Sequence, residues 1–336
     1  MEETLEIVVA DIGGTYARFA RAQLHAGKVA SFSSPVTLQT NDFASLRLCW
    51  EAFARSQDTP LPKDASIAVA SPVSGDVVKL TNSSWLIQPA HLRDELGLDT
   101  IILLNDFSAV GHAVAHLPPE GFSHLTGPGR PLPESGVISV IGPGTGLGVS
   151  HILREAGQTF IVSGEGGHID FAPLDRFEDY LLTRLRSRYP RVSIERVVSG
   201  PGLSNIYQSL AEMERYPVRF TDDRLLWNSA LSGADSLAAA ALARFCQCLG
   251  AVAGDLALAH GAGAVVIAGG IGARLAGYLP KSGFAARFAA KGRFEQIMAD
   301  MPVKLLIHPQ PGLYGAAMAF LAASWSTTAK LRQDRR

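Results

Sequence analysis

An acidic residue at the abrupt end of an apolar segment is the sharpest chemical feature of this sequence. Residues 100–104 (TIILL) predict a strand buried on both faces, and Asn105 and Asp106 follow where a helix over 107–116 begins. In open α/β sheets, ligands bind at the carboxyl ends of strands. A carboxylate there can accept a hydroxyl proton while the oxygen attacks phosphorus. Asp106 is therefore predicted to be a catalytic base. The alternative is that it caps helix 107–116, and the two roles are compatible.

A first glycine turn (11–15, DIGGT) links two predicted strands and has the composition of a phosphate site. Gly13 and Gly14 let backbone N–H groups come close to a ligand, which suits phosphate oxygens. Asp11 ends a buried strand, where a carboxylate is costly unless a cation or hydrogen bonds satisfy it. A hydrated Mg²⁺ shared with ATP phosphates meets that need. The alternative is a hairpin in which Asp11 merely caps the turn.

A second glycine turn (142–148, GPGTGLG) has four glycines in seven residues. It lacks the Lys-[Ser/Thr] ending of a P-loop and contains no G-x-G-x-x-G, which disfavours Walker-type and Rossmann phosphate sites. At a constant offset of 130 residues it aligns with the first turn, pairing Gly14 with Gly144 and Thr15 with Thr145. The repeat predicts a duplicated architecture with a cleft between the halves.

Three further segments carry polar or glycine residues suited to a ligand. Gly269 and Gly270 end the apolar strand predicted at 264–268, where they permit either close approach of adenine or tight helix packing. Glu165 and His168 flank two glycines and can hydrogen-bond sugar hydroxyls. The rival interpretation is a metal site, but a lone Glu-x-x-His is a poor zinc site. Glu195 is, from its local sequence, more typical of a surface charge.

Strand and helix patterns alternate along the chain, which indicates an α/β fold with a mixed sheet. The Pro- and Gly-rich segment 117–136 is the best domain boundary, and the polar tail 326–336 is expected to fray. Strands are predicted at 5–10, 16–20, 30–38, 66–70 paired in a hairpin with 76–80, 100–104, 264–268 and 303–308; helices are predicted at 42–56 with Asn41 or Asp42 as cap, 107–116, 175–188, 202–215, 234–260 and 313–324.

Composition excludes several classes of protein. The 336 residues include 47% hydrophobic and 18% charged residues, which is typical of a large buried core. Thirty Lys and Arg against 31 Asp and Glu give a net charge of −1, so neither a nucleic acid nor an anionic membrane is an expected partner. Cys49, Cys246 and Cys248 form neither a zinc nor a disulfide framework, which suits a reducing compartment. No signal peptide or membrane span is recognised, which predicts a soluble cytoplasmic protein.

Seven segments occur in the order found in bacterial glucokinases, and the resemblance covers residues 5–323. They are ADIGGTYARFA, SPVSGDVVKLTNSSW, LLNDFSAVGHAV, IGPGTGLGVSHI, GEGGHIDFAP, ERVVSGPGL and VIAGGIGARL. The resemblance implies the duplicated actin-like ATPase (ribonuclease H-like) fold of the hexokinase, actin and heat-shock-chaperone superfamily, with two α/β domains whose mixed sheets flank a cleft. It places a small domain at 1–116 plus 308–336 and a large domain at 117–307.

The resemblance also implies a reaction and a role for each motif. ATP would phosphorylate the 6-hydroxyl of glucose to give glucose 6-phosphate and ADP, the first step of glycolysis, with Asp106 as base. The sugar ligands would be Asn82, Asn105, Asp106, Glu165, His168 and Glu195. The nucleotide would contact Ala10, Asp11, Ile12, Gly13, Gly14, Thr15, Gly144 and Thr145 through its phosphates and Gly269 and Gly270 through adenosine, with Mg²⁺ held by Asp11 through water.

Two absences accompany the resemblance. A related repressor and sugar-kinase group carries a zinc-binding cysteine cluster after its Gly-His motif, but here IDFAP follows His168, so no zinc is expected. No helix-turn-helix segment precedes Leu5, so a repressor is not expected. A homodimer is implied by the resemblance alone.

Two other functions stay open at this stage. One is a kinase of the same fold that acts on another sugar, on glycerol or on a carboxylate. The other is an ATP-driven binding protein of the actin or chaperone type, which would not need Glu165 and His168 beside Asp106. The sequence also does not decide between ATP and polyphosphate as donor, or between glucose and its close epimers.

Overall fold

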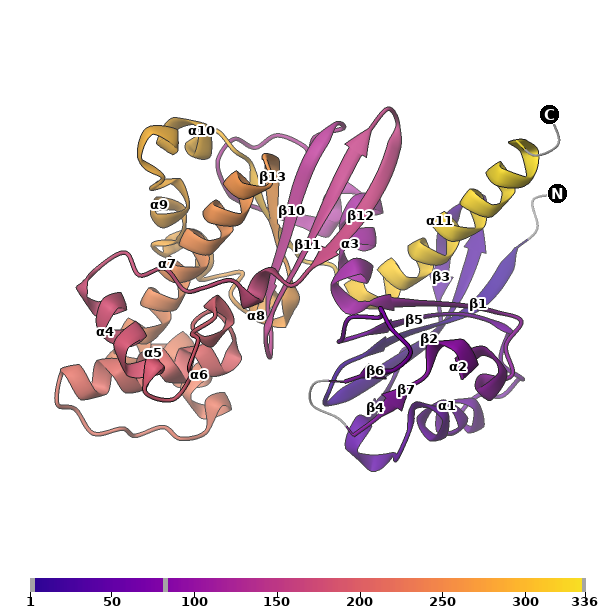
Figure 1. The fold of residues 1–336 in the computed structure, drawn as a ribbon, viewed down its shortest axis with the longest axis horizontal. Coiled ribbons are helices and arrows are strands. Elements are labelled where there is room, and N and C mark those ends of the chain that lie inside the picture. The colour runs from indigo at the N-terminus through magenta and orange to yellow at the C-terminus, as the bar shows by residue number, and fades with distance from the viewer. Residues whose placement is uncertain (1–3, 81–83, 334–336) are drawn as a thin grey trace. The chain divides into compact units, whose positions relative to one another are not determined.

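The structure of the chain is a computed structural model that describes residues 4–80 and 84–333 (Figure 1). Residue contacts divide the chain into two compact units. Unit 1 comprises Met1–Leu117 and Pro309–Arg336, and unit 2 comprises Pro118–His308. The segment predicted as a domain boundary begins at this first division.

Unit 1 is built on a mixed sheet with the strand order β3-β2-β1-β5-β8, in which β4 also pairs with β2. β1 and β2 form an antiparallel hairpin, whereas β1, β5 and β8 are parallel. The strands are β1 Leu5–Ile12, β2 Tyr16–His25, β3 Lys28–Phe32, β4 Val36–Gln39, β5 Asp64–Val69 and β8 Thr100–Asn105, and a separate two-stranded sheet pairs β6 Val78–Lys79 with β7 Leu86–Ile87.

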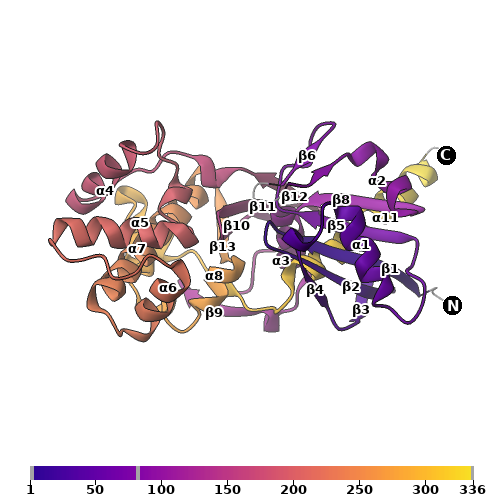
Figure 2. The same ribbon diagram turned by 90° about the horizontal axis from the view of Figure 1, so that it is seen from below.

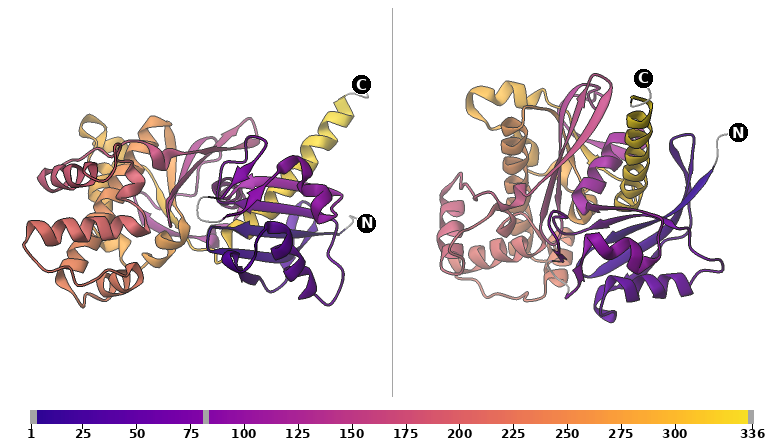
Figure 3. Two further views of the ribbon diagram at one scale, coloured as in Figure 1. Left: turned by 60° about the horizontal axis from the view of Figure 1, so that its bottom comes forward. Right: turned by 45° about the vertical axis from the view of Figure 1, so that its right-hand side comes forward.

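Helices cover both faces of this sheet because its strands alternate apolar side chains on both sides. In β1, Val8, Ala10 and Ile12 belong to the core that includes α1 and α2, while Ile7 and Val9 pack with α11. The helices are α1 Leu46–Arg55, α2 Pro89–Leu96, α3 Asp106–His116 and α11 Pro311–Gln333. Helices α3 and α11 run side by side (Figure 3). A Cβ on Gly315 of α11 would lie 1.7 Å from the Ala109 carbonyl oxygen of α3, so glycine lets these helices touch.

Unit 2 contains a second mixed sheet with the order β12-β11-β10-β13-β14-β9. Its strands are β9 Phe122–Thr126, β10 Gly136–Pro143, β11 Leu147–Glu155, β12 Gln158–Gly164, β13 Ala262–Ile267 and β14 Val303–Leu306. Its helices are α4 Arg176–Arg186, α5 Gly200–Met213, α6 Asp223–Ser232, α7 Ser236–Ala259, α8 Gly269–Arg274, α9 Phe284–Ala289 and α10 Glu295–Ala299.

Helix α7 runs through the core of unit 2, among α4, α5 and α6 (Figure 2). It is long and apolar enough to cross a membrane by length and composition, and no other described helix is. However, 67% of its apolar window is buried inside the protein. That burial is typical of the core helix of a globular domain, and the Ala- and Leu-rich sequence of α7 suits this position.

The two sheets share a plan, as the internal repeat predicted. The β1–β2 hairpin pairs in parallel with β5, and the β10–β11 hairpin pairs in parallel with β13. The constant offset of 130 residues does not hold throughout. The last paired residues before each turn are Ile12 with Ala17 in the first hairpin and Pro143 with Leu147 in the second. The strands that follow the turns, β2 and β11, therefore correspond at an offset of 130 residues, whereas the strands that precede them, β1 and β10, correspond at an offset of 131. The second turn is one residue shorter.

Several predicted elements of unit 1 differ from the structure. The strand expected over 30–38 is two strands, β3 and β4, because Ser33-Ser34-Pro35 interrupts it. The predicted hairpin of 66–70 with 76–80 is wrong, since β5 pairs with β1 and β8 while β6 pairs with β7. Helix α1 begins later than expected, after the cap Ser45, whose hydroxyl accepts a hydrogen bond from the Leu48 N–H.

Strand β8, predicted to be buried on both faces, is the edge strand of its sheet. Residues 101–103 are only partly buried there, and Leu104 is buried. At the chain's end, the tail expected to fray continues as helix α11 as far as Gln333. In unit 2, the sequence patterns do not predict helices α6, α9 and α10.

Candidate functional site

Two predicted site segments of unit 1 meet at one edge of its sheet. The register places Ile12 beside Val69 and Val69 beside Asn105, so the carboxyl ends of β1, β5 and β8 are level. The first glycine turn and Asp106 therefore leave the sheet at the same edge. This is the edge at which open α/β sheets bind ligands.

Asn105, rather than Asp106, caps helix α3. The Asn105 Oδ1 accepts hydrogen bonds from the N–H groups of Phe107 at 2.8 Å and Ser108 at 3.2 Å. Its Nδ2 donates to the Ser71 carbonyl at 3.3 Å. The alternative that Asp106 is the cap is therefore wrong. Asn105, predicted as a sugar ligand, already has both ends of its amide in hydrogen bonds.

Asp106 is the first residue of α3 and is half-buried. Its Oδ1 also accepts from the Phe107 N–H, at 2.8 Å. The partial positive charge of a helix N-terminus favours a charged carboxylate at this position. The local structure thus suits an ionised Asp106, which is the form that accepts a proton.

The first glycine turn is held by a residue that the sequence did not single out. Gly13 N–H donates to the Tyr16 carbonyl at 2.9 Å, which closes the turn. Thr40 is fully buried; its hydroxyl donates to the Gly14 carbonyl at 2.7 Å and its N–H to the Thr15 carbonyl at 3.0 Å. One residue therefore donates to two carbonyls of the turn. Thr40 lacked a local signal because its partners lie in a distant segment.

Ala10 and Ile12, predicted to contact the nucleotide, have fully buried side chains in the core of unit 1. Their side chains pack in this core and are not exposed at the turn. Thr15 is exposed, and Gly13 and Gly14 are partly exposed. The accessible part of the turn is therefore 13–15.

Asp11 lies at the end of β1, with 24% of its side-chain surface exposed. Arg18, its partner across the hairpin, donates to Asp11 Oδ2 over a long 3.5 Å. Burial raises the pKa of Asp11, and the Arg18 charge opposes that rise. A partly buried carboxylate with one distant cation fits a hydrated Mg²⁺, which takes few protein ligands.

The second glycine turn of unit 2 is fixed by neighbours on several elements. Gly144 N–H donates to the Gly146 carbonyl at 2.8 Å, and Gly200 N–H, at the start of α5, donates to the Gly144 carbonyl at 2.7 Å. Thr145 at its tip is exposed. A Cβ on Gly269 would lie 2.6 Å from the Pro143 carbonyl oxygen, at a φ of +76°. Gly269 therefore packs tightly against this turn, whereas a Cβ on Gly270 would meet open space.

Glu165 directly precedes a short 3₁₀ helix, η3 (Gly166–His168), and His168 is its last residue. The His168 Nε2 and Glu165 Oε2 atoms are 3.9 Å apart, and both side chains are more than half exposed. A Cβ on Gly167 would lie 2.2 Å from the Leu147 carbonyl oxygen, so glycine brings this segment onto the start of β11. In the part of the chain that the structure describes, no group of three or more His, Cys, Asp or Glu residues could hold a metal ion.

Glu195 is not the surface charge that its local sequence indicated. It lies half-buried in the 3₁₀ helix η4 (Ile194–Arg196), and its Oε2 accepts from the Leu147 N–H at 2.9 Å. Ile194 N–H donates to the Ile169 carbonyl at 2.9 Å, which ties η4 to the segment after His168. Three segments of unit 2 that are far apart in sequence therefore gather at the second glycine turn.

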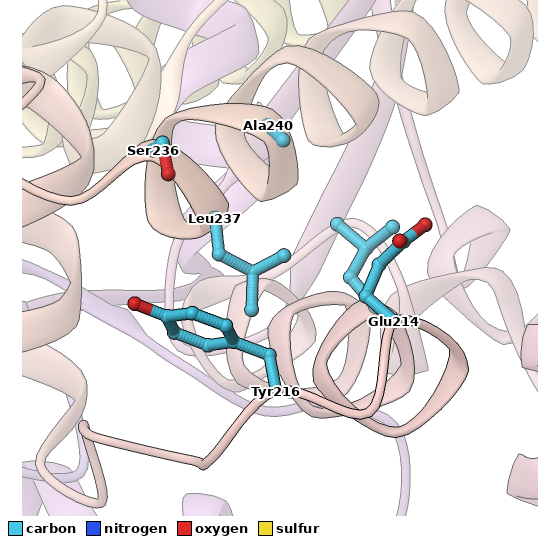
Figure 4. Close-up of a pocket in the computed structure, with 6 residues that line it drawn as sticks. Glu214, Tyr216, Ser236, Leu237 and Ala240 are labelled. Atoms are coloured by element: carbon cyan, nitrogen blue, oxygen red, sulfur yellow. The ribbon is translucent and has the colours of Figure 1, made fainter.

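Two predicted features lie apart from these groups. Asn82 is outside the residues that the structure describes. A cavity of about 400 Å³ in unit 2 holds none of the candidate residues; the side chains of Tyr216 and Leu237 project toward it (Figure 4). The residues that line this cavity are Leu210, Glu214, Tyr216, Ser236, Leu237 and Ala240.

Comparison with known proteins identifies the family to which this arrangement belongs. A sequence profile described as Glucokinase matches residues 8–323. A glucokinase of Zymomonas mobilis subsp. mobilis is 56% identical over 316 residues, which cover 94% of this chain and 98% of that protein. A solved glucokinase from an Antarctic psychrotroph is 34% identical, with a TM-score of 0.80 over 94% of this chain and 98% of that one.

A glucokinase from Balamuthia mandrillaris, solved in complex with glucose, is 20% identical with a TM-score of 0.76 over 93% of this chain and 92% of that one, and shares the fold. The two sheets with a common plan are those of the two-domain actin-like ATPase fold. The chain therefore belongs to the glucokinase family and is an ATP-dependent glucose kinase.

Proposed function

We propose that Asp106 is the general base of this kinase and acts on the 6-hydroxyl of glucose. The oxygen would attack the γ-phosphorus of ATP as its bond to ADP breaks, and the hydroxyl proton would pass to Asp106. The observation that carries the proposal is the position of Asp106 at the carboxyl edge of the sheet, with Asn105 supplying the helix cap. Because the proton leaves late, a carboxylate that stays ionised is suitable.

Glu165, His168 and Glu195 are proposed to hold the sugar hydroxyls. Exposed, neighbouring carboxylate and imidazole groups offer acceptors and a donor for hydroxyls. Asn105 and Asn82 complete the proposed set. For Asn105, a contact with sugar would have to coexist with its cap and its bond to Ser71.

The two glycine turns are proposed to bind the ATP phosphates through residues 13–15 and through Gly144 and Thr145. Gly270, with open space where a Cβ would project, is proposed to lie at adenosine, while Gly269 shapes the strand end beneath. Asp11 is proposed to hold Mg²⁺ through water. When bound, Mg²⁺ would neutralise charge on the transferring phosphoryl group.

A coupled assay of ADP release tests which acceptor and which donor the protein uses. We expect release with ATP to depend on sugar and to be fastest with glucose among glucose, mannose, fructose and N-acetylglucosamine. Glycerol and acetate serve as acceptors for the rival kinase classes, and polyphosphate replaces ATP in a parallel arm. Equal ADP release with and without every acceptor would favour an ATPase of the actin or chaperone type instead.

We further propose that the protein acts in the cytoplasm as a homodimer. The resemblance to bacterial glucokinases supports both points. The three cysteines are free and buried, which is compatible with a reducing compartment.

A further inference from the structure

The Glu195 carboxylate has two oxygens with different surroundings. Oε2 accepts the Leu147 N–H at 2.9 Å, at the point where the second glycine turn enters β11. Oε1 has no hydrogen-bond partner within residues 4–80 and 84–333. One oxygen is therefore committed to the turn, and the other is available to a ligand.

Gly146 is shaped to this carboxylate. A Cβ at position 146 would lie 2.3 Å from Glu195 Oε2 and 3.0 Å from its Cδ. The backbone of Gly146 is not in the left-handed region, so an alanine there meets no conformational barrier of its own. The contact with Glu195 is thus the physical reason for glycine at this position.

We propose that Glu195 is a positioning residue for the second glycine turn in addition to its proposed role as a sugar ligand. The consequence of this inference rests on the proposed function as a sugar ligand. Sugar bound at Oε1 would hold in place the same side chain whose Oε2 accepts the Leu147 N–H. A side chain ordered by one ligand costs less to order for the next. Glucose and ATP therefore bind cooperatively through one carboxylate, and both contacts lie within unit 2.

Calorimetric titration with the non-hydrolysable analogue AMP-PNP, with and without saturating glucose, measures this coupling. We expect glucose to tighten AMP-PNP binding about fivefold in the unchanged protein, within the usual range of couplings between sites. Glu195→Ala should weaken AMP-PNP binding about tenfold, as expected for loss of a charge-assisted hydrogen bond. Glu195→Gln keeps an acceptor oxygen for the Leu147 N–H and should retain AMP-PNP affinity to within about threefold.

A matched control is Glu165→Ala, which removes the same charge from the proposed sugar ligands without touching the turn. It should weaken glucose binding and leave AMP-PNP binding in the absence of glucose unchanged. An effect of Glu165→Ala on AMP-PNP equal to that of Glu195→Ala would overturn the inference, because general loss of negative charge would then explain both.

A double-mutant cycle with Gly146→Ala isolates the contact. Alone, Gly146→Ala should weaken AMP-PNP binding about tenfold, because the new methyl group displaces the Glu195 carboxylate. In the Glu195→Ala background the same change should cost almost nothing, because the methyl group then has room. Equal losses in both backgrounds would overturn the inference, and far-ultraviolet circular dichroism checks that each variant is folded.

The two proposals about Glu195 fail in different ways. If Glu195→Ala weakens AMP-PNP but leaves glucose affinity unchanged, the sugar role is wrong and the positioning role stands. If it weakens glucose alone, the positioning role is wrong.

Discussion

The position of the Asp11 carboxylate depends on Gly312, a residue of the distant C-terminal helix. A Cβ on Gly312, in the first turn of α11, would lie 2.6 Å from both Cγ and Oδ2 of Asp11. The first turn of helix α11 therefore lies in direct contact with the Asp11 carboxylate, which is proposed to hold Mg²⁺ through water. Glycine here serves a close approach, since its φ is not in the left-handed region.

Gly312→Ala should displace Asp11 and raise the KM for MgATP about tenfold, with a higher Mg²⁺ concentration needed for half-maximal rate. Steady-state kinetics over a range of Mg²⁺ concentrations measure the effect. Gly277→Ala is the control, because a Cβ there meets nothing within 4 Å. If the rate of Gly312→Ala depends on Mg²⁺ concentration as that of the unchanged protein does, the proposal that Asp11 holds Mg²⁺ is wrong.

Asp106→Asn should lower kcat by about 10²-fold or more while glucose still binds. Asparagine keeps an oxygen that can accept the Phe107 N–H, so the start of α3 is preserved. The comparison is Asp94→Asn on α2, a carboxylate whose side chain is 73% exposed. Near-normal turnover of a folded Asp106→Asn protein would remove Asp106 from the role of base.

A buried histidine makes stability depend on pH. His151 on β11 is 9% exposed, is hydrogen-bonded to Ser139 at 3.1 Å, and stacks on His260 with ring centroids 3.7 Å apart. Burial, and then the neighbouring His260, lower the pKa of His151 to about 4 from its ordinary 6.5. Between these values the unfolded chain binds more protons than the folded one, so folding loses stability as pH falls through this window.

Lowering the pH from 7 to 5 should therefore cost about 2 kcal/mol of unfolding free energy through His151. His151→Asn removes the titrating group, and urea unfolding at both pH values should show a correspondingly smaller difference. An equal loss of stability in both proteins would show that other groups carry the acid sensitivity.

At the scale of elements, the proposed site depends on where strands end and what holds the turns after them. β8 leads directly into Asp106, and although β8 is an edge strand, its register with β5 sets its end level with the end of β1. The first glycine turn is held by Thr40, at the end of β4, through two of its carbonyls. Pairing of β4 with β2 is what brings Thr40 to the turn.

Thr40→Val, which replaces a hydroxyl by a methyl group of similar size, should loosen the turn and raise the KM for ATP about tenfold, with a smaller change in the KM for glucose. Valine leaves the Gly14 carbonyl without its buried donor. Thr40→Ser restores the donor and should recover most of the ATP affinity. Failure of serine to rescue a folded Thr40→Val defect would mean that packing, rather than the hydroxyl, matters.

At the scale of the whole chain, the proposed reaction uses residues of both compact units. Asp11 and Asp106 belong to unit 1, whereas Glu165, His168 and Glu195 belong to unit 2. Each unit supplies one glycine turn from the same β-hairpin plan. The duplication thus gives each unit one of the glycine turns proposed to bind phosphate, and the other proposed site residues differ between the units.

The proposed homodimer has a direct test. Light scattering coupled to size-exclusion chromatography should give twice the chain mass of 35.7 kDa across a range of protein concentrations. Measurement with and without glucose and AMP-PNP serves as an internal comparison. A mass of one chain at micromolar concentration and above would contradict the proposal.

The sequence by itself determined the α/β class, the duplicated hairpins and the presence of acidic residues close to where β1 and β8 end, because these follow from local patterns of apolar, glycine and acidic residues. The predicted strand ends at residues 10 and 104 fall short of the observed ends at Ile12 and Asn105. It could not determine that Asn105 takes the cap, because Asn and Asp cap helices about equally well. The tertiary structure alone decided that β5 pairs with β1 rather than with 76–80. It also decided that Thr40 contacts the first glycine turn, that Gly312 contacts Asp11 and that Glu195 contacts the second glycine turn. Contacts between distant segments depend on how whole elements pack.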